Sequence, residues 1–171
     1  MAIRTARLIA LAGLPGSGKS TLADALAQRL GAVWLRIDTI EQAIRDAGVL
    51  KAEIGPAGYI VGYAIAGTNL RLGHVVVADS VNPIAVTRDA WRDVATRAGA
   101  PCLEIEVICS DPAEHRRRVE TRAVDVARLI PPSWAEVMGR EWHPWTRPRL
   151  VVDTAGRDIE ACVDEIAAHL P

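Results

Sequence analysis

The feature that most constrains this chain is the segment Gly13–Ser20, which reads GLPGSGKS and fits the pattern G-x-x-x-x-G-K-[ST] without a mismatch. An apolar run at residues 8–12 precedes it and is typical of a buried strand, and residues 21–30 follow with helical periodicity. A strand, a glycine-rich loop and a helix in this order form a P-loop, in which backbone N–H groups and the helix N-terminus bind phosphate. The sequence therefore predicts a site for a nucleoside triphosphate, in preference to a glycine-rich turn that binds nothing.

Individual roles within this segment follow from the chemistry of phosphate. We expect the Lys19 ammonium to reach the β- and γ-phosphates during phosphoryl transfer, and the Ser20 hydroxyl to coordinate a Mg²⁺ ion. The glycines let the backbone curl so that successive N–H groups point into one cavity. The predicted phosphate-binding residues are Gly13, Leu14, Pro15, Gly16, Ser17, Gly18, Lys19, Ser20 and Thr21.

Length and composition narrow the classes of protein further. A chain of 171 residues predicts a single domain, residues 1–171, and no apolar run approaches the roughly 18 residues of a membrane span. The formal net charge of −1 argues against binding to nucleic acid, which normally needs a basic excess. The three cysteines, Cys102, Cys109 and Cys162, lack the spacing of a metal site, so we expect reduced thiols in a cytoplasmic protein.

Apolar runs rich in β-branched residues alternate with longer helical stretches along the chain. This alternation predicts an α/β domain with a five-stranded parallel sheet flanked by helices. Residues 124–145, which contain the pair Pro131-Pro132, fit neither pattern. We expect strands over residues 8–12, 33–37, 74–79, 102–109 and 150–153, and helices over 21–30, 39–47, 60–72, 84–98, 112–122 and 158–170.

Two aspartates follow predicted strands at the edge of the sheet where ligands of α/β proteins bind. Asp38 follows the second strand and is our candidate for the carboxylate that orients or deprotonates an acceptor hydroxyl. Asp79 ends the apolar third strand, as a Walker B aspartate does, and is our candidate for the partner of Mg²⁺. For each of them the alternative is the N-cap of the following helix, an ordinary role for aspartate.

An arginine-rich helix follows the fourth strand. Asp111 and Pro112 predict its start, because they fit an N-cap and a first-turn proline. On a helix Arg118 and Arg122 share a face, so their guanidinium groups could clamp the transferring phosphoryl group. The alternative is a solvated basic face paired with nearby glutamates. The position before the proline-containing segment favours a mobile lid over about residues 118–145.

Together, the P-loop, Asp38, Asp79 and the helix that carries Arg118 and Arg122 resemble the small P-loop kinases. This group includes chloramphenicol phosphotransferase, zeta toxin, gluconate kinase, adenylylsulfate kinase and the polynucleotide kinase domains. The resemblance implies a three-layer P-loop NTPase fold with sheet order 2-3-1-4-5, a small helical lid, and transfer of the ATP γ-phosphoryl group to a hydroxyl. It also implies that Asp38 activates the acceptor and that Arg118 or Arg122 is a lid arginine.

The loop after the fifth strand is the other part of the site that this resemblance implies. Adenine would lie between the arginine helix and the residues Thr154, Ala155 and Gly156. With Asp153 they also spell the Asp-x-x-Gly of GTPases, but in GTPases that motif follows the third strand. The sequence contains no Asn-Lys-x-Asp segment, with which GTPases bind guanine. We therefore expect ATP rather than GTP.

One position departs from the pattern of several of these kinases. Where they carry Asp-x-x-Arg, with an arginine that grips an anionic group on the acceptor, this chain has Asp38-Thr39-Ile40-Glu41. Glu41 would repel phosphate or sulfate, which favours a neutral or cationic acceptor such as an alcohol, sugar, nucleoside or amine-bearing compound. Arg45, one helical turn further on, could replace the missing arginine. The candidate acceptor residues are Asp38, Glu41, Arg45, Tyr59, Tyr63, Asn69 and Asn82, with core packing an equal alternative for both tyrosines.

The segment Trp142-His143-Pro144-Trp145 favours packing of two tryptophans between lid and core over a metal or catalytic site. Three functions stay open at this point. The leading hypothesis is an ATP- and Mg²⁺-dependent kinase for a small hydroxyl-bearing acceptor. The alternatives are a kinase for a polynucleotide or tRNA-linked hydroxyl, and a regulatory ATPase that hydrolyses ATP only to change shape.

Overall fold

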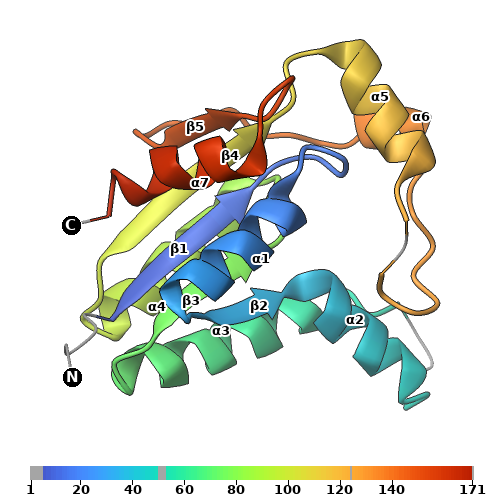
Figure 1. The fold of residues 1–171 in the computed structure, drawn as a ribbon. Coiled ribbons are helices and arrows are strands. Elements are labelled where there is room, and N and C mark those ends of the chain that lie inside the picture. Colours follow the sequence, from blue (N-terminus) through green and yellow to red (C-terminus); the bar gives the residue numbers. More distant parts are fainter. Residues whose placement is uncertain (1–5, 50–52, 124, 171) are drawn as a thin grey trace.

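The computed structural model describes residues 6–49, 53–123 and 125–170. A parallel sheet of five strands forms its centre, with helices on both faces (Figure 1). The strand order β2-β3-β1-β4-β5 confirms the order that the kinase resemblance implies. The strands are β1 (Arg7–Ala12), β2 (Val33–Arg36), β3 (Val75–Asp79), β4 (Cys102–Ile108) and β5 (Leu150–Asp153).

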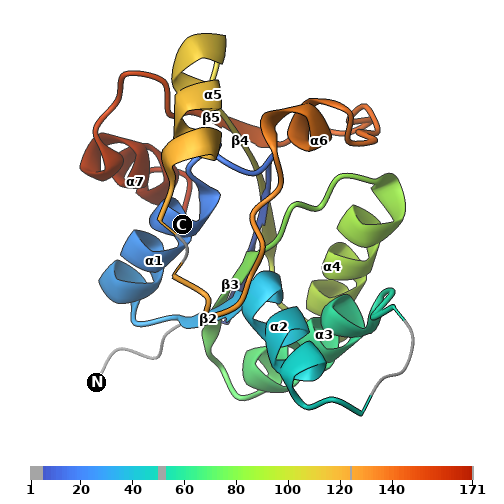
Figure 2. The same ribbon diagram turned by 90° about the vertical axis from the view of Figure 1, so that its right-hand side faces the viewer.

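The helices make the outer layers of a three-layer sandwich. Two of them cover one face of the sheet, namely α1 (Lys19–Leu30) and α7 (Ile159–Ala167), and two cover the other, namely α3 (Ala57–Arg71) and α4 (Ala85–Arg97). The remaining helices lie beyond the carboxyl ends of the strands (Figure 2). They are α2 (Ile37–Asp46), α5 (Pro112–Thr121) and α6 (Trp134–Met138).

Strand β1 shows why the sheet reads as a continuous apolar run. Ile9 and Leu11 pack in the core below α1 and α7, whereas Leu8 and Ala10 pack in the core below α3 and α4. All four side chains are buried, because helices cover both faces of a parallel sheet and both sets of alternating positions must be apolar.

Several local signals act as the sequence predicts. The Asp111 side chain caps α5 by accepting hydrogen bonds from the backbone N–H groups of Ala113 and Glu114, and Pro112 opens the helix. Gly31 ends α1 in the left-handed conformation, with φ of 55°.

Two boundaries differ from the prediction in ways that move a candidate residue. Strand β2 ends at Arg36 because its partner β3 ends at the paired residue Asp79, so Asp38 lies in the first turn of α2 rather than after a strand. The N-cap alternative is therefore wrong for both aspartates, since the caps of α2 and α4 are Arg36 and Ile84. Arg122 ends α5 in an extended conformation, with ψ of 136°, so it does not continue the helical face of Arg118.

Residues 122–123 and 125–133 lie between α5 and α6 in the sequence, and the described residues of this segment run from α5 toward α2 (Figure 2). Ser133 and Glu136 form a capping box that starts α6, and the Trp134 ring meets the His115 ring of α5 edge-on at 5.2 Å. Within the described residues, no helix has the length and apolar character needed to cross a membrane.

Candidate active site

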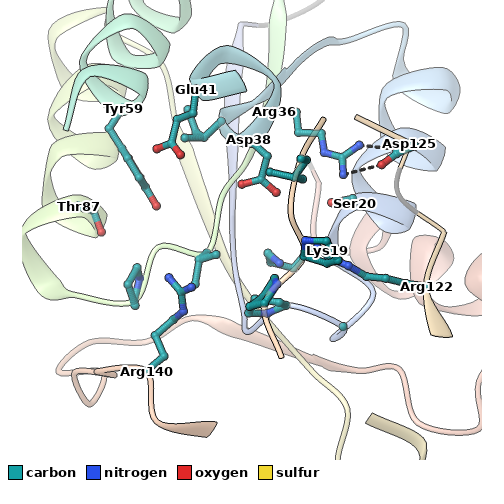
Figure 3. Close-up of a pocket in the computed structure, with 18 of the residues that line it drawn as sticks. Lys19, Ser20, Arg36, Asp38, Glu41, Tyr59, Thr87, Arg122, Asp125 and Arg140 are labelled. Carbon is teal, nitrogen blue, oxygen red and sulfur yellow. Dashed lines mark hydrogen bonds and ion pairs between the residues drawn. The ribbon is translucent and has the colours of Figure 1, made fainter. Parts of the chain in front are cut away.

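A cavity of about 1220 Å³ lies beyond the carboxyl ends of the strands, between the P-loop and the starts of α2, α3 and α4. The segment between α5 and α6 forms its other wall (Figure 3). This cavity brings together most of the residues that the sequence predicts for the site. They are Pro15, Gly16, Gly18, Lys19, Ser20, Thr21, Asp38, Glu41, Arg45, Tyr59, Tyr63, Arg118 and Arg122.

The P-loop is shaped by glycines that other residues could not replace. Gly16 and Gly18 have φ of 82° and 94°, the left-handed region that favours glycine. A Cβ atom on Gly16 would lie 2.6 Å from Cγ2 of Val119, so α5 packs directly on the loop. The loop is therefore fixed between its own helix and α5.

Lys19 lies at the centre of the phosphate site and is almost fully buried. Its ammonium donates a hydrogen bond of 3.4 Å to the Leu14 carbonyl. Burial lowers the pKa of Lys19, the charges of Asp79 and Asp38 oppose this, and Arg122 adds to the lowering. Burial removes water from the Lys19 ammonium, so phosphate oxygens that replace this water would stabilise its positive charge.

The surroundings of Asp79 are compatible with its predicted role as a partner of Mg²⁺. Burial raises its pKa, while the Lys19 charge and a hydrogen bond with Ser20 oppose the rise. Its Oδ2 atom is buried and has no hydrogen-bond partner among the described residues, although Nε of Arg36 lies 3.9 Å away. A buried carboxylate oxygen without a donor beside a serine hydroxyl suits a hard cation such as Mg²⁺. The described residues contain no group of three or more His, Cys, Asp or Glu side chains that could hold a metal, so phosphate oxygens and water would complete the coordination.

Asp38 faces the phosphate site from the first turn of α2. Its carboxylate points into the cavity toward Lys19 and Ser20 (Figure 3). Within the described part of the chain no group donates a hydrogen bond to this carboxylate or forms an ion pair with it. Both carboxylate oxygens are thus free to accept a hydrogen bond from a bound molecule.

The two tyrosines of α3 both line the cavity and pack in the core, so both predicted alternatives apply. The Tyr59 hydroxyl accepts a hydrogen bond of 3.1 Å from the backbone N–H of Asn82. The Tyr63 hydroxyl donates to the Thr87 carbonyl at 3.4 Å, and its ring meets Trp91 edge-on at 4.6 Å.

The two asparagines do not line the cavity, which corrects their prediction as acceptor residues. Asn82 is buried at φ of 53°, and its carbonyl accepts a hydrogen bond from Arg88, so it shapes the loop after β3. Asn69 lies ten residues after Tyr59 on α3, which is close to three turns, and donates to the Ile65 carbonyl.

The arginines of α5 have different surroundings. Arg116 and Arg117 are exposed and pair with Glu120 and Glu114, as the solvated alternative predicts. Arg118 instead joins α5 to the loop after β5, because it donates to the Thr154 hydroxyl at 2.7 Å and to the Thr154 carbonyl at 3.0 Å.

The loop predicted to contact adenine is held by these same elements. The backbone N–H of Gly156 donates to Glu114 at 2.9 Å, and Glu114 also pairs with Arg118 at 2.6 Å. The Thr154 hydroxyl lies 2.8 Å from the Ser17 carbonyl of the P-loop. Thr154, Ala155 and Gly156 do not line the cavity, so the structure places this loop behind the phosphate site and beside α5.

Several cavity residues escaped the sequence analysis, among them Arg36, Asp125 and Arg140. Arg140 follows α6, and Figure 3 shows its guanidinium pointing into the cavity from the wall opposite Glu41. Among the described residues neither Arg140 nor Arg122 has an ion-pair partner within 4.0 Å. The capping-box sequence Ser133-Trp134-Ala135-Glu136 is the signal that could have predicted α6 and hence the place of Arg140.

The two tryptophans predicted to join lid and core surround a buried arginine. The Arg88 guanidinium lies 5.1 Å from the centre of the Trp142 ring and 4.2 Å from that of Trp145. It also donates to three backbone carbonyls, those of Asn82, Pro83 and His143. The segment therefore has the packing role that the sequence predicts, with Arg88 as its unpredicted partner.

The family model described as an AAA domain matches residues 8–131, which is most of the chain and includes the P-loop, Asp38 and Arg118. The chain belongs to this AAA domain family. An uncharacterized protein of Mycobacterium tuberculosis is 33% identical to this chain in an alignment of 108 residues that covers 56% of this chain. The match covers only 20% of the length of that relative.

Two kinases are similar to this chain over nearly its whole length. A probable adenylyl-sulfate kinase of Aeropyrum pernix is 27% identical over 164 residues, covering 88% of this chain and 84% of the relative. The structure of the Mycobacterium tuberculosis APS kinase, in complex with AMPPNP and APS, superposes with a TM-score of 0.72 at 20% identity and covers 99% of both chains. These comparisons confirm the resemblance to small P-loop kinases and support a nucleotide-dependent kinase.

Proposed function

We propose that this protein is an ATP- and Mg²⁺-dependent phosphotransferase, acting in the cytoplasm, that moves the γ-phosphoryl group to a hydroxyl of a small, non-anionic acceptor. The observation that supports it best is the free carboxylate of Asp38, which faces Lys19 across the cavity. A protein that only binds ATP has no need for such a carboxylate on the acceptor side of the phosphate site, whereas an ATPase would use one to orient water.

The residues divide into a phosphate side and an acceptor side. The P-loop N–H groups and Lys19 bind the β- and γ-phosphates, and Arg118 fixes the Thr154 loop beside the nucleotide. Ser20 and Asp79 would hold Mg²⁺, which supplies neutralisation of phosphate charge when it is bound. Arg122, which has no ion-pair partner among the described residues, approaches the transferring group beside Lys19.

The transfer itself needs little covalent chemistry from the protein. Asp38 accepts the hydrogen bond of the acceptor hydroxyl and orients its oxygen toward the γ-phosphorus. As the bond between this oxygen and phosphorus forms, the bond from phosphorus to the β,γ-bridging oxygen breaks and ADP leaves. The hydroxyl proton passes to Asp38 and then to solvent. Lys19 and the lid arginines stabilise the charge on the transferring group.

Glu41 gives the reason for a non-anionic acceptor. Its side chain lines the cavity one helical turn after Asp38, and a phosphate or sulfate there would face two carboxylates. Arg45, the alternative partner for an anionic acceptor, is already paired with Glu41 at 3.3 Å.

An acceptor screen tests this function. The protein would be incubated with Mg²⁺, γ-labelled ATP and single members of a panel that contains sugars, nucleosides, amino alcohols and short 5′-hydroxyl oligonucleotides. Transfer of label to a small neutral or cationic alcohol is expected. ATP hydrolysis that is unaffected by every alcohol would contradict the proposal and favour a regulatory ATPase, and label on oligonucleotides alone would favour a polynucleotide kinase.

A further inference from the structure

Three exposed aliphatic side chains line the cavity outside the P-loop. Ile60 of α3, Val86 of α4 and Ile130 of the segment before α6 all line it, and they are 59%, 66% and 87% exposed. They come from three different elements, yet they border the same space. Because large aliphatic groups gain free energy when a ligand removes them from water, this grouping favours an acceptor with an apolar body.

The hydroxyl groups in the same region are already engaged. The Tyr59 hydroxyl is bonded to Asn82, the Tyr63 hydroxyl to the Thr87 carbonyl, and the Thr87 hydroxyl to the Ile84 carbonyl at 2.9 Å. Each of these hydroxyls has at least one partner within the fold, and the rings are the larger surface that the tyrosines offer to a ligand. A sugar, which needs many hydrogen bonds to replace those it makes with water, would find few partners here.

Glu41 is a charged residue among these apolar and aromatic side chains, and its position is fixed by contacts with α3 and Arg45. A Cβ atom on Gly58 would lie 2.3 Å from Cγ of Glu41, so the Glu41 side chain crosses α3 where a glycine leaves room. One carboxylate oxygen pairs with Arg45 at 3.3 Å. No described residue donates a hydrogen bond to the other oxygen, and Figure 3 shows the carboxylate directed toward the Tyr59 side of the cavity. Burial raises the pKa of Glu41, with Asp38 adding to the rise and Arg45 and Arg140 opposing it.

We propose, on the basis of the phosphotransferase function above, that the acceptor is an apolar amino alcohol. Its hydroxyl binds at Asp38, its ammonium at Glu41, and its apolar body against Ile60, Val86 and Ile130.

The spacing of the two carboxylates sets the distance between the functional groups of the acceptor. Asp38 and Glu41 lie three residues apart on α2, so they share a helical face with about 5–6 Å between their Cβ atoms. A hydroxyl and an ammonium two or three bonds apart can reach both carboxylates. Two arginines act on Glu41: Arg45 pairs with it at 3.3 Å, and Arg140 faces it across the cavity and helps to lower its pKa. Their charges offset part of the negative charge of the two carboxylates, and the test with an anionic acceptor below measures which charge dominates.

Three matched aryl alcohols and one sugar test the proposal. They are 2-amino-1-phenylethanol, which is cationic, 1-phenylethane-1,2-diol, which is neutral, mandelate, which is anionic, and glucose. Initial rates of γ-phosphoryl transfer from ATP give kcat/KM for each acceptor. We expect the amine to exceed the diol, and to exceed mandelate and glucose by about tenfold or more.

Two variants separate a direct role of Glu41 from a general loss of activity. Glu41→Gln should reduce the ratio of amine to diol to about one while transfer to the diol persists. Gly58→Ala should also lower the preference for the amine, since the added methyl group displaces the Glu41 side chain. The matched control is Asp93→Asn, which breaks another Asp/Glu–Arg pair at i and i+4 but on the exposed surface of α4, and it should keep the wild-type ratio.

The outcomes distinguish this proposal from the function on which it rests. Transfer to glucose or mandelate in preference to the amine would leave a kinase but overturn the amino-alcohol class. An amine preference that survives Glu41→Gln would overturn the assignment of the ammonium to Glu41. Absence of transfer to all four compounds, together with transfer to another class in the wider screen, would likewise overturn the amino-alcohol class. Absence of transfer to any acceptor in that screen would overturn the kinase itself.

Discussion

Arg36 and Asp125 form a two-point ion pair that joins the end of β2 to the segment between α5 and α6, with Nη2 and Oδ1 3.0 Å apart (Figure 3). A hydrogen bond from Arg36 lowers the pKa of Asp125. The same guanidinium lies near Asp79, so this pair connects the predicted lid to the predicted metal site. A change at Asp125 should therefore affect the nucleotide site through Arg36.

Replacing Asp125 by asparagine should loosen the lid. We expect faster amide hydrogen exchange over residues 125–133 and faster release of a bound nucleotide analogue. The free energy of unfolding should change by no more than about 1 kcal/mol, because the Asp125 side chain is largely exposed. Asp164→Asn removes another exposed pair, with Arg29 on the far side of α1, and serves as the control. Equal rates of amide exchange over residues 125–133 in the two variants would contradict a role of the Arg36–Asp125 pair in holding the lid.

Arg88 should be among the most sensitive positions for stability. Arg88→Met would leave three carbonyls without their donor and remove the contact with two tryptophan rings. The expected loss is roughly 3 kcal/mol or more in the free energy of unfolding, measured by urea denaturation. Arg92→Met, one turn further along α4 at a half-exposed site, should cost far less. Similar losses in the two variants would contradict a specific role for the buried guanidinium.

The effect of pH on stability tests the environment of Glu41. Burial raises the pKa of Glu41 above its ordinary value of 4.5, so the folded protein binds this proton more tightly than the unfolded chain does. The stabilising contribution of Glu41 is then complete below pH 4.5 and is lost as pH rises through the raised pKa. The Tm of Glu41→Gln relative to wild type should therefore increase from below pH 4.5 to neutral pH. A difference in Tm between variant and wild type that stays constant over this range would show that burial does not raise the pKa of Glu41.

The sequence predicts the parts of the fold that depend on local pattern. The P-loop, the five apolar strands and the Asp111 cap all have signals that lie within a few neighbouring residues. The strand order came from the resemblance to kinases, since no local pattern encodes which strands are neighbours. The placement of Asp38, Glu41 and the tyrosines around one cavity follows from this order together with the start of α2.

Other features depend on contacts between distant segments, and the sequence alone could not predict them. The end of β2 depends on the length of β3, which is why Asp38 proved to lie inside a helix. The packing of Arg88 between Trp142 and Trp145 joins residues more than fifty positions apart. The two asparagines were chosen only for their positions along the chain, and the turn of α3 and the left-handed backbone of Asn82 direct them elsewhere.

The most direct test of the account is a paired measurement on Asp38→Asn. The affinity for ATP with Mg²⁺ and the rate of phosphoryl transfer to the best acceptor of the screen would be determined for the variant and for wild type. We expect ATP affinity to stay within about threefold, because the P-loop and Lys19 are unchanged, and transfer to fall by about 10²-fold or more. Transfer at the wild-type rate would contradict the assignment of Asp38 as the residue that orients and deprotonates the acceptor.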